Sequence, residues 1–220
     1  MSYKGMLALL SLAALLGLSA TPATTAPEPN EAPMTWEFDI RYETPQPIMV
    51  QAPGEDRPQR FWYFLYTVTN RSGEDREFAP EIALYTNTGQ VISAGQGVNP
   101  VAYQTVKQII NDPLLTDTLG ITGKMLQGED NAKTAVAIFR DFDPKAASFT
   151  IFFGGLSGET AMVHLPTPIT LPDPLEEGKN IETSTVMLSK TLALTYNVGA
   201  EAKGRTKAEI RLVDKTWVMR

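Results

Sequence analysis

Large apolar and charged side chains alternate without error at the start of the longest patterned part of the chain. The run reads Trp36-Glu37-Phe38-Asp39-Ile40-Arg41-Tyr42-Glu43. Because successive side chains of a β-strand point to opposite faces, this spacing predicts a strand with one buried and one solvated face. Its four bulky residues should therefore point into a shared interior, and their charged neighbours should meet solvent.

Further short segments of β character follow, separated by turn residues. Near its start, the segment Phe61–Thr69 is apolar at odd and even positions alike, so both faces of the strand would be apolar. This is typical of a central strand covered on two sides. Strands at this spacing favour a sandwich or a barrel. Gly154-Gly155 with Gly158 predicts a hairpin turn between two strands. The other expected strands are Ile48–Gln51, Phe78–Leu84, Val91–Ala94, Thr134–Arg140, Ser148–Phe153, Glu159–Leu165, Leu192–Val198 and Ala208–Val213, with Trp217–Met219 extending the last.

One helix is expected among these strands. Asn99 suits an N-cap, Pro100 suits the first helical position, and apolar residues recur at helical spacing until Pro113 stops the helix. We interpret residues 100–127 as a helical insertion or crossover that covers one edge of the sheet, because an edge strand with unpaired backbone groups needs such cover.

Two stretches carry a resemblance to a known class of domain. YTVTNRSGEDREFAPEIALYTNTG, residues 66–89, resembles the strand–turn–strand pattern of immunoglobulin-like modules in exported bacterial proteins, and GEDNAKTAVAIFRDFDPKAASFTIFFGGLSGE, residues 128–159, looks like a second half. The resemblance implies a mainly β, immunoglobulin-like β-sandwich with one helical insertion. The resemblance covers under half of the mature chain and implies no activity, since the proteins that carry this pattern are uncharacterised exported ones.

The N-terminus has the pattern of a secretory signal. Lys4 precedes an apolar run from Met6 to Leu18, which is well short of the ~20 residues of a membrane-spanning helix. We expect a signal peptide over residues 1–26, cleaved after Ala26, with Ala20 and Ala23 as alternative sites. An uncleaved anchor or a buried N-terminal helix is the other interpretation. A disordered linker over 27–35 and one domain over 36–220 would follow, with no transmembrane segment in the mature chain, in a periplasmic or extracellular protein.

Composition narrows the possible chemistry. The chain has no cysteine, which excludes disulfides, thiol nucleophiles and a cysteine-linked lipid anchor. His164 is the only histidine, so a multi-histidine metal centre is excluded. On a strand, His164 would point to the same face as Met162 and not toward an acidic residue, so a catalytic triad is not indicated. We therefore expect no enzyme activity and no cofactor.

Charge is distributed unevenly along the chain. From residue 27 to 189 there are 22 acidic against 11 basic residues, a net of −11, whereas residues 190–220 carry 3 acidic and 7 basic ones, a net of +4. The acidic body argues against a nucleic-acid partner, which requires a basic footprint. The basic end could dock on an acidic surface or simply form a solvated face.

Three local patterns suggest binding. Asp141 and Asp143, at a strand end, are weak calcium candidates, although no third acid lies nearby. Asn70-Arg71-Ser72 matches a glycosylation sequon. A sugar-stacking platform could be built from aromatic residues, although core packing is their default use; these are Trp36, Trp62, Tyr63, Phe64, Tyr66 and Trp217.

The sequence thus favours a non-catalytic exported module that contacts an unknown protein or envelope component. A glycan- or calcium-binding extracytoplasmic module is the alternative. An enzyme that uses only carboxylates, such as a glycosidase, is the third hypothesis.

Overall fold

The structure, a computed structural model, describes residues 26–31, 35–173, 176, 178–199 and 210–220. The expected signal peptide lies outside the described residues except for Ala26, as do the alternative cleavage sites Ala20 and Ala23. The fold is mainly β with a single α-helix among the described residues, as the sequence predicts.

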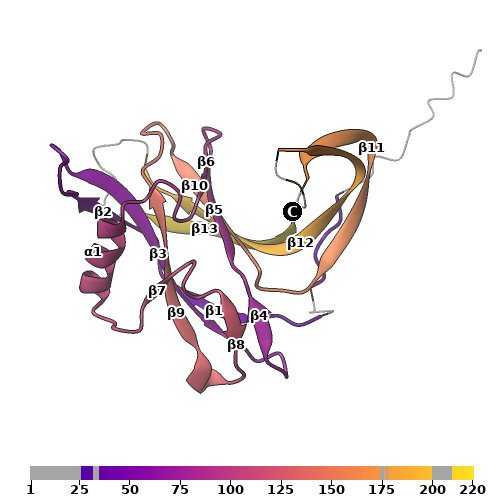
Figure 1. The fold of residues 1–220 in the computed structure, drawn as a ribbon, viewed down its shortest axis with the longest axis horizontal. Coiled ribbons are helices and arrows are strands. Elements are labelled where there is room, and N and C mark those ends of the chain that lie inside the picture. The colour runs from indigo at the N-terminus through magenta and orange to yellow at the C-terminus, as the bar shows by residue number, and fades with distance from the viewer. Residues whose placement is uncertain (1–25, 32–34, 174–175, 177, 200–209) are drawn as a thin grey trace, which may run out of the picture.

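Two mainly antiparallel sheets form the body of the molecule (Figure 1). The first has the order β1-β3-β9-β7, with β2 also paired to β3 and with β7 parallel to β9. Its strands are β1 (Asp39–Tyr42), β2 (Gln46–Val50), β3 (Gln59–Thr69), β7 (Thr116–Asp117) and β9 (Lys133–Arg140).

The second sheet has the order β11-β12-β10-β5-β6, with β13 also paired to β12. A separate two-stranded sheet joins β4 to β8, and a short 3-10 helix, η1 (Glu129–Asn131), follows it. The strands are β4 (Arg76–Phe78), β5 (Glu81–Thr86), β6 (Val91–Ser93), β8 (Gly123–Met125), β10 (Ser148–Gly154), β11 (Thr160–Pro172), β12 (Asn180–Asn197) and β13 (Arg211–Met219).

The main core lies between the two sheets and is rich in aromatic rings. Tyr66 of β3 meets Phe153 of β10 edge to face at 4.8 Å between ring centres, and Trp62 meets Phe149 at 5.8 Å. Edge-to-face packing at these separations is favourable because the positive ring edge meets the negative ring face. The predicted alternation holds for the bulky residues: Phe38 is buried, and the three others pack half-buried against the same core, namely Trp36, Ile40 and Tyr42. The regular strand is shorter than predicted, and Glu37, which was expected to meet solvent, instead lies half-buried beside Lys190.

The helix α1 (Pro100–Ile110) covers the outer face of the first sheet. The Asn99 side chain accepts a hydrogen bond from the main-chain N–H of Val101, and Asn111 ends the helix in the left-handed region at φ 54°. Buried Ala102 and Val106 contribute to a second apolar cluster with residues of β2, β3 and β9. The helix therefore lies over a sheet face, whereas the sequence suggested cover over an edge; β7, in the same insertion, adds an edge strand instead.

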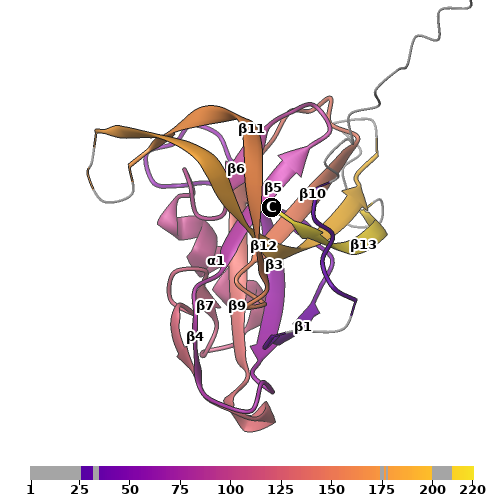
Figure 2. The ribbon, with the colours of Figure 1, turned by 90° about the vertical axis from the view of Figure 1, so that its right-hand side faces the viewer.

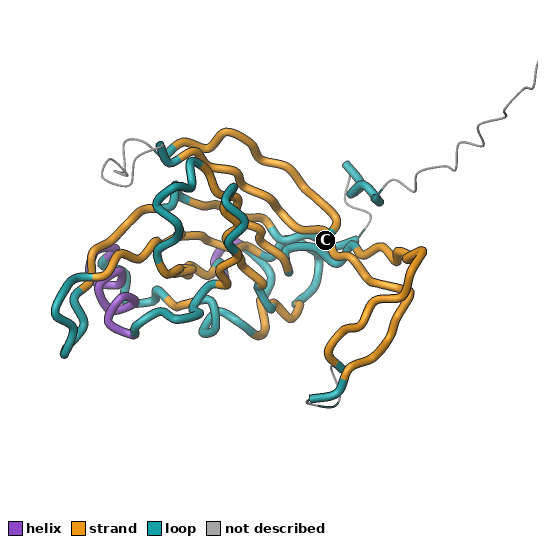
Figure 3. Tube along the Cα trace, turned by 90° about the horizontal axis from the view of Figure 1, so that it is seen from above, coloured by secondary structure: helices purple, strands orange, loops and turns teal. Residues whose placement is uncertain are grey.

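β11 and the first half of β12 leave the body as a long two-stranded ribbon, which we call the arm (Thr160–Pro172 with Asn180–Ser189). Figures 1 and 3 show the arm projecting from the two-sheet body, and Figure 2 shows the same projection from the side. β12 pairs with β10 and β13 only from Lys190 onwards. Among the described residues, the two strands of the arm therefore pair only with each other. The sequence predicted only the first part of β11, over 159–165, and the body half of β12, over 192–198; it did not predict the arm half of β12.

The glycine-rich stretch before the arm is not the hairpin turn that the sequence predicted. β10 and β11 do not pair with each other; both pair antiparallel with β12, one after the other along its length. Gly155 lies at φ +85°, and an added Cβ there would meet the Ala79 carbonyl oxygen at 2.4 Å. Glycine is therefore required where the chain steps from the body into the arm.

Candidate interaction surface

A buried lysine marks the root of the arm. The Lys190 side chain is only 2% exposed, and its Nζ lies 3.4 Å from a Glu37 carboxylate oxygen and 3.3 Å from one of Glu159. Nζ also donates to the main-chain carbonyl of Asn30 at 3.0 Å and lies 5.2 Å from the centre of the Trp217 ring. These partners come from the segments that lead into β1 and β11, from β13 and from the N-terminal segment, so one ammonium group joins all four.

Asn30 completes this cluster from the N-terminal side. Its main-chain N–H and its side-chain amide both donate to the same oxygen of Glu159, at 2.8 Å each. The Asn30 main-chain donor lowers the pKa of Glu159 most, burial opposes it, and the Asn30 amide and Lys190 lower it further. Asn30 lies in the stretch 27–35 that the sequence predicts to be a disordered linker. Asn30 itself has defined contacts with Glu159 and Lys190, and the linker as a whole stays a prediction.

The same corner is tied to the opposite sheet by main-chain hydrogen bonds. Phe38 N donates to Leu156 O at 2.8 Å, and Gly158 N donates to Trp36 O at 3.1 Å. A Cβ at Gly158 would lie 2.4 Å from the indole nitrogen of Trp36, so this glycine allows the two segments to approach closely. The arm therefore leaves from a corner where both sheets are joined.

The outer face of the second sheet carries a groove at the foot of the arm. The groove has a volume of about 770 Å³, and Tyr85, Phe152 and Met187 contribute to its wall. The guanidinium of Arg220 lies over the Phe152 ring at 4.3 Å and over the Tyr85 ring at 4.5 Å, and it donates to the Tyr85 hydroxyl. Rings and an arginine at the centre of a solvent-facing sheet are unlike the polar surface usual there.

A second cleft adjoins the groove and shares residues with it. It has a volume of about 570 Å³ and lies between the start of α1 and the loop after β7, with Pro80, Ala94 and Thr118 lining both hollows. Leu119, which is 82% exposed, stands at this cleft. Together the two hollows extend the concave surface beyond the sheet itself, and polar residues such as Glu81, Ser157 and Thr191 line the groove beside the rings.

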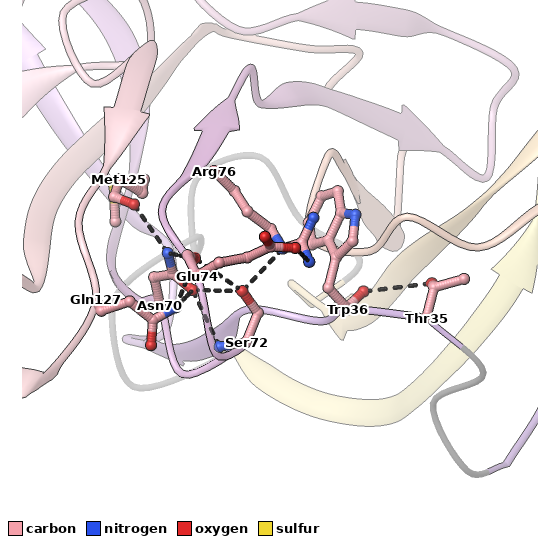
Figure 4. A network of polar contacts seen from close by, with 8 residues as sticks. All are labelled: Thr35, Trp36, Asn70, Ser72, Glu74, Arg76, Met125 and Gln127. Carbon is pink, nitrogen blue, oxygen red and sulfur yellow. Dashed lines mark hydrogen bonds and ion pairs between the residues drawn. The ribbon is translucent and has the colours of Figure 1, made fainter.

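A polar network on the other side of the molecule has a structural role. Asn70 donates to the carbonyls of Glu74 and Met125, at 2.9 and 2.8 Å, and accepts from Ser72 (Figure 4). Its side chain thereby joins the turn after β3 to β8. Asn70 is fully buried, so the structure uses the asparagine of the predicted sequon for packing and leaves it no exposure for a glycan.

The two calcium candidates have other partners. Asp141 accepts from the indole N–H of Trp62 at 2.8 Å. Asp143 accepts from the main-chain N–H of Lys145 at 2.8 Å, and its own N–H donates to the Gln90 side chain. No group of three histidine, cysteine, aspartate or glutamate side chains that could hold a metal ion occurs within the described residues. Both carboxylates are explained by local structure, and calcium binding stays a prediction.

The structure also places His164 and the predicted aromatic platform. His164 is exposed on the arm, where its Nδ1 lies 3.3 Å from the Thr185 hydroxyl. Four of the six platform rings are buried in the body, so they are inaccessible to a sugar; these are Trp62, Tyr63, Phe64 and Tyr66. The sequence analysis did not single out Tyr85 and Phe152. The available signal was that buried residues flank each of them along its strand, so that both rings point to the outer face.

Comparison of the chain with protein-family models, with curated proteins and with solved structures found no match. In the described part of the chain, no helix has the length and apolar character needed to span a membrane.

Proposed function

We propose that the protein is a non-catalytic, exported module that contacts another protein through the groove on the outer face of its second sheet. The fold would be an elaborated immunoglobulin-like sandwich, in a periplasmic or extracellular protein. The N-terminal pattern supports export, and two face-to-face, mainly antiparallel sheets support the fold assignment. The observation that carries the proposal is the Tyr85–Phe152–Arg220 stack inside the groove.

This stack has the composition of a protein-binding surface. Tyrosine, phenylalanine and arginine are enriched at the centres of protein interfaces, where they combine large apolar contact area with a polar end. Val91 lies at the same groove and is 51% exposed, which adds apolar area around the rings. A partner that inserts an apolar side chain there would displace water from the rings and leave the guanidinium available for a carboxylate or carbonyl.

A photo-reactive amino acid placed in the groove tests this proposal. Introduced at Ala83, which pairs with Phe152 and lines the groove, it should form a covalent adduct with one protein in the cells that produce the chain. The matched position is Ile109, which is 55% exposed on the helix that covers the opposite sheet. Adducts should form from Ala83 and not from Ile109, and Phe152→Glu should abolish them, because it places a charge on the apolar face.

The captured partner should then bind the purified chain. We expect Phe152→Glu to weaken that binding at least about tenfold, as is usual for a central aromatic anchor. The absence of an adduct at Ala83, equal adducts at both positions, or adducts that survive Phe152→Glu would each overturn the groove as the contact site.

A further inference from the structure

One face of the arm carries two exposed methionine side chains directly opposite each other. Met162 of β11 pairs with Met187 of β12, and the two residues are 62% and 66% exposed. The Lys190 N–H donates to Glu159 O at 2.9 Å just before this pair. Because hydrogen-bonded and non-hydrogen-bonded pairs alternate along antiparallel strands, the methionine pair is non-hydrogen-bonded, with its Cα atoms about 4.5 Å apart. The two thioether groups can therefore meet.

The only histidine of the chain lies on the same face. His164 is two residues beyond Met162 on β11, and its facing residue on β12 is Thr185. Residues two apart on a strand point to the same side and lie roughly 7 Å apart along it. A methionine side chain is unbranched and rotates about three bonds, so it adapts to this separation. Two thioethers and one imidazole can thus converge on one point above the arm.

Thr185 is placed to orient the histidine ring. Its hydroxyl lies 3.3 Å from Nδ1 of His164. A histidine that binds a metal through one ring nitrogen commonly donates the N–H of the other to a neighbouring oxygen, which fixes the tautomer. With Nδ1–H donated to the Thr185 hydroxyl, Nε2 keeps its lone pair for a bond to a metal.

The side chains of this face suit a soft cation. Thioether sulfur favours Cu(I), and imidazole binds copper as well. The chain has no cysteine, so methionine provides its soft ligands. Residues 160–164 and 185–189 contain no charged side chain. They therefore offer no carboxylate to a hard cation such as Ca²⁺ and no lysine or arginine that would repel a cation.

A purely apolar role explains this face less well. Exposed methionines also occur at promiscuous protein-binding surfaces, but such a use requires no histidine beside them. On the opposite face of the same segments, Val163 and Val186 are half-buried. Within 160–164 and 185–189, the exposed side chains are thus confined to the face with the two sulfurs and the imidazole.

We propose that Met162, Met187 and His164 form a Cu(I) site on the arm, with the two Sδ atoms and Nε2 as its three ligands. Thr185 is a positioning residue that holds the imidazole at Nδ1. The cation binds and leaves without a change of charge, so the site requires no oxidant or reductant. The inference goes beyond the proposed function, because the site needs no protein partner.

Titration with silver nitrate tests the ligands, because Ag(I) is a soft cation like Cu(I) and is stable in air. Since the chain has one histidine, the NMR signals of the His164 ring need no assignment. Silver should shift these signals and the methyl signals of Met162 and Met187. The matched position is Met49, which is 56% exposed on β2 of the body, and its methyl signal should not shift.

Competition of the purified chain with a coloured Cu(I) chelator, under reducing conditions, measures the affinity. Met162→Leu keeps the size and apolar character of the side chain and removes the sulfur. Loss of an outer-shell partner already lowers metal affinity about 10–100-fold, so loss of this direct ligand should lower it at least about tenfold. Met49→Leu should leave the affinity unchanged, and excess Zn²⁺ should not displace Cu(I), because Zn²⁺ prefers thiolate, imidazole and carboxylate ligands.

Two variants test the positioning role of Thr185. Thr185→Val removes the hydroxyl and should lower the affinity for Cu(I) about tenfold, whereas Thr185→Ser keeps the hydroxyl and should retain the affinity. Nitrogen NMR shifts of His164 report which ring nitrogen carries the proton. They should show Nδ1 protonated in the wild-type and Thr185→Ser chains, and a changed tautomer balance in Thr185→Val. Circular dichroism shows whether each variant is folded.

Three results would overturn the Cu(I) site: His164 signals that silver leaves in place, equal losses of affinity in Met49→Leu and Met162→Leu, or displacement of Cu(I) by excess Zn²⁺. The site and the groove fail independently of each other. Phe152→Glu in the groove should leave the affinity for Cu(I) unchanged, and Met162→Leu should leave the Ala83 adduct intact. Met187 does not serve in this comparison, because it also contributes to the wall of the groove.

Discussion

The two-sheet body and the arm are built from the same kind of strand and differ in what covers them. In the body, alternate residues of β3 and β10 meet across the interior, and Phe64, Phe153 and Leu194 are each fully buried. In the arm, Met162 and Met187 stand opposite each other on neighbouring strands and both remain more than 60% exposed. Period-two alternation therefore predicts which side chains share a face, while burial requires a second layer.

The largest loss of stability that tests this comparison is expected for a substitution in the body. Phe153→Ala removes a fully buried ring that contacts Tyr66 and Phe64, and it should lower the free energy of unfolding by about 3–5 kcal/mol. Urea denaturation measures it. The neighbouring Phe152→Ala, on the outer face, is the matched control and should cost clearly less; equal losses would contradict the assignment of inner and outer faces.

Next in size is the cluster that joins body and arm. Lys190→Ala leaves the carboxylates of Glu37 and Glu159 without their shared cation, which should cost about 3 kcal/mol, in the range for a broken buried ion pair. Thermal unfolding followed by circular dichroism measures the loss. Adding Glu159→Gln to Lys190→Ala should recover part of it, because one unpaired charge disappears. No recovery in the double variant would contradict a charge-based role for Lys190.

A smaller, pH-dependent effect follows from the lowered pKa of Glu159. A carboxyl whose pKa is lower in the folded state stabilises the fold above its unfolded pKa of about 4.5, and this contribution is lost as pH falls through the folded value. The wild-type chain should therefore lose stability below about pH 4.5 more steeply than Glu159→Gln. Urea midpoints between pH 3 and 7 measure the difference, and parallel curves would contradict it.

The smallest effect is expected at the arm tip. Leu171→Ser replaces a side chain that is 38% exposed, and the unfolding free energy should change by no more than about 0.5 kcal/mol. Differential scanning calorimetry provides the measurement. A loss comparable to that of Phe153→Ala would mean that the arm packs as tightly as the body.

The sequence predicts those elements whose local pattern of apolar, polar and turn residues reflects their surroundings in the fold. Residues 36–43 and Phe61–Thr69 were recognised because their alternation or continuous apolarity reflects the layers that cover them. The helix can be recognised because Asn99 and Pro100 mark its start and because Pro113 follows closely after its C-cap Asn111. The arm was missed because prolines interrupt β11 and because polar threonines in β12 weaken the period-two pattern.

The candidate surface was harder to predict than the fold. Tyr85 and Phe152 come together only through the pairing of β5 with β10, which no local pattern specifies. Arg220 reaches them from the far end of the chain, beside β12. Lys190 reads as a single charge in the sequence, and its burial between two glutamates depends on contacts with residues more than 150 positions away.

Because β12 runs unbroken for 18 residues from the arm into the body, the two regions are mechanically connected. A pull along β12 from the arm would load its hydrogen bonds to β10 and β13 in parallel, so that many would have to break at once. A pull that peels β11 from β12 would open their bonds one after another. The molecule should thus resist tension along its arm far better than tension across it.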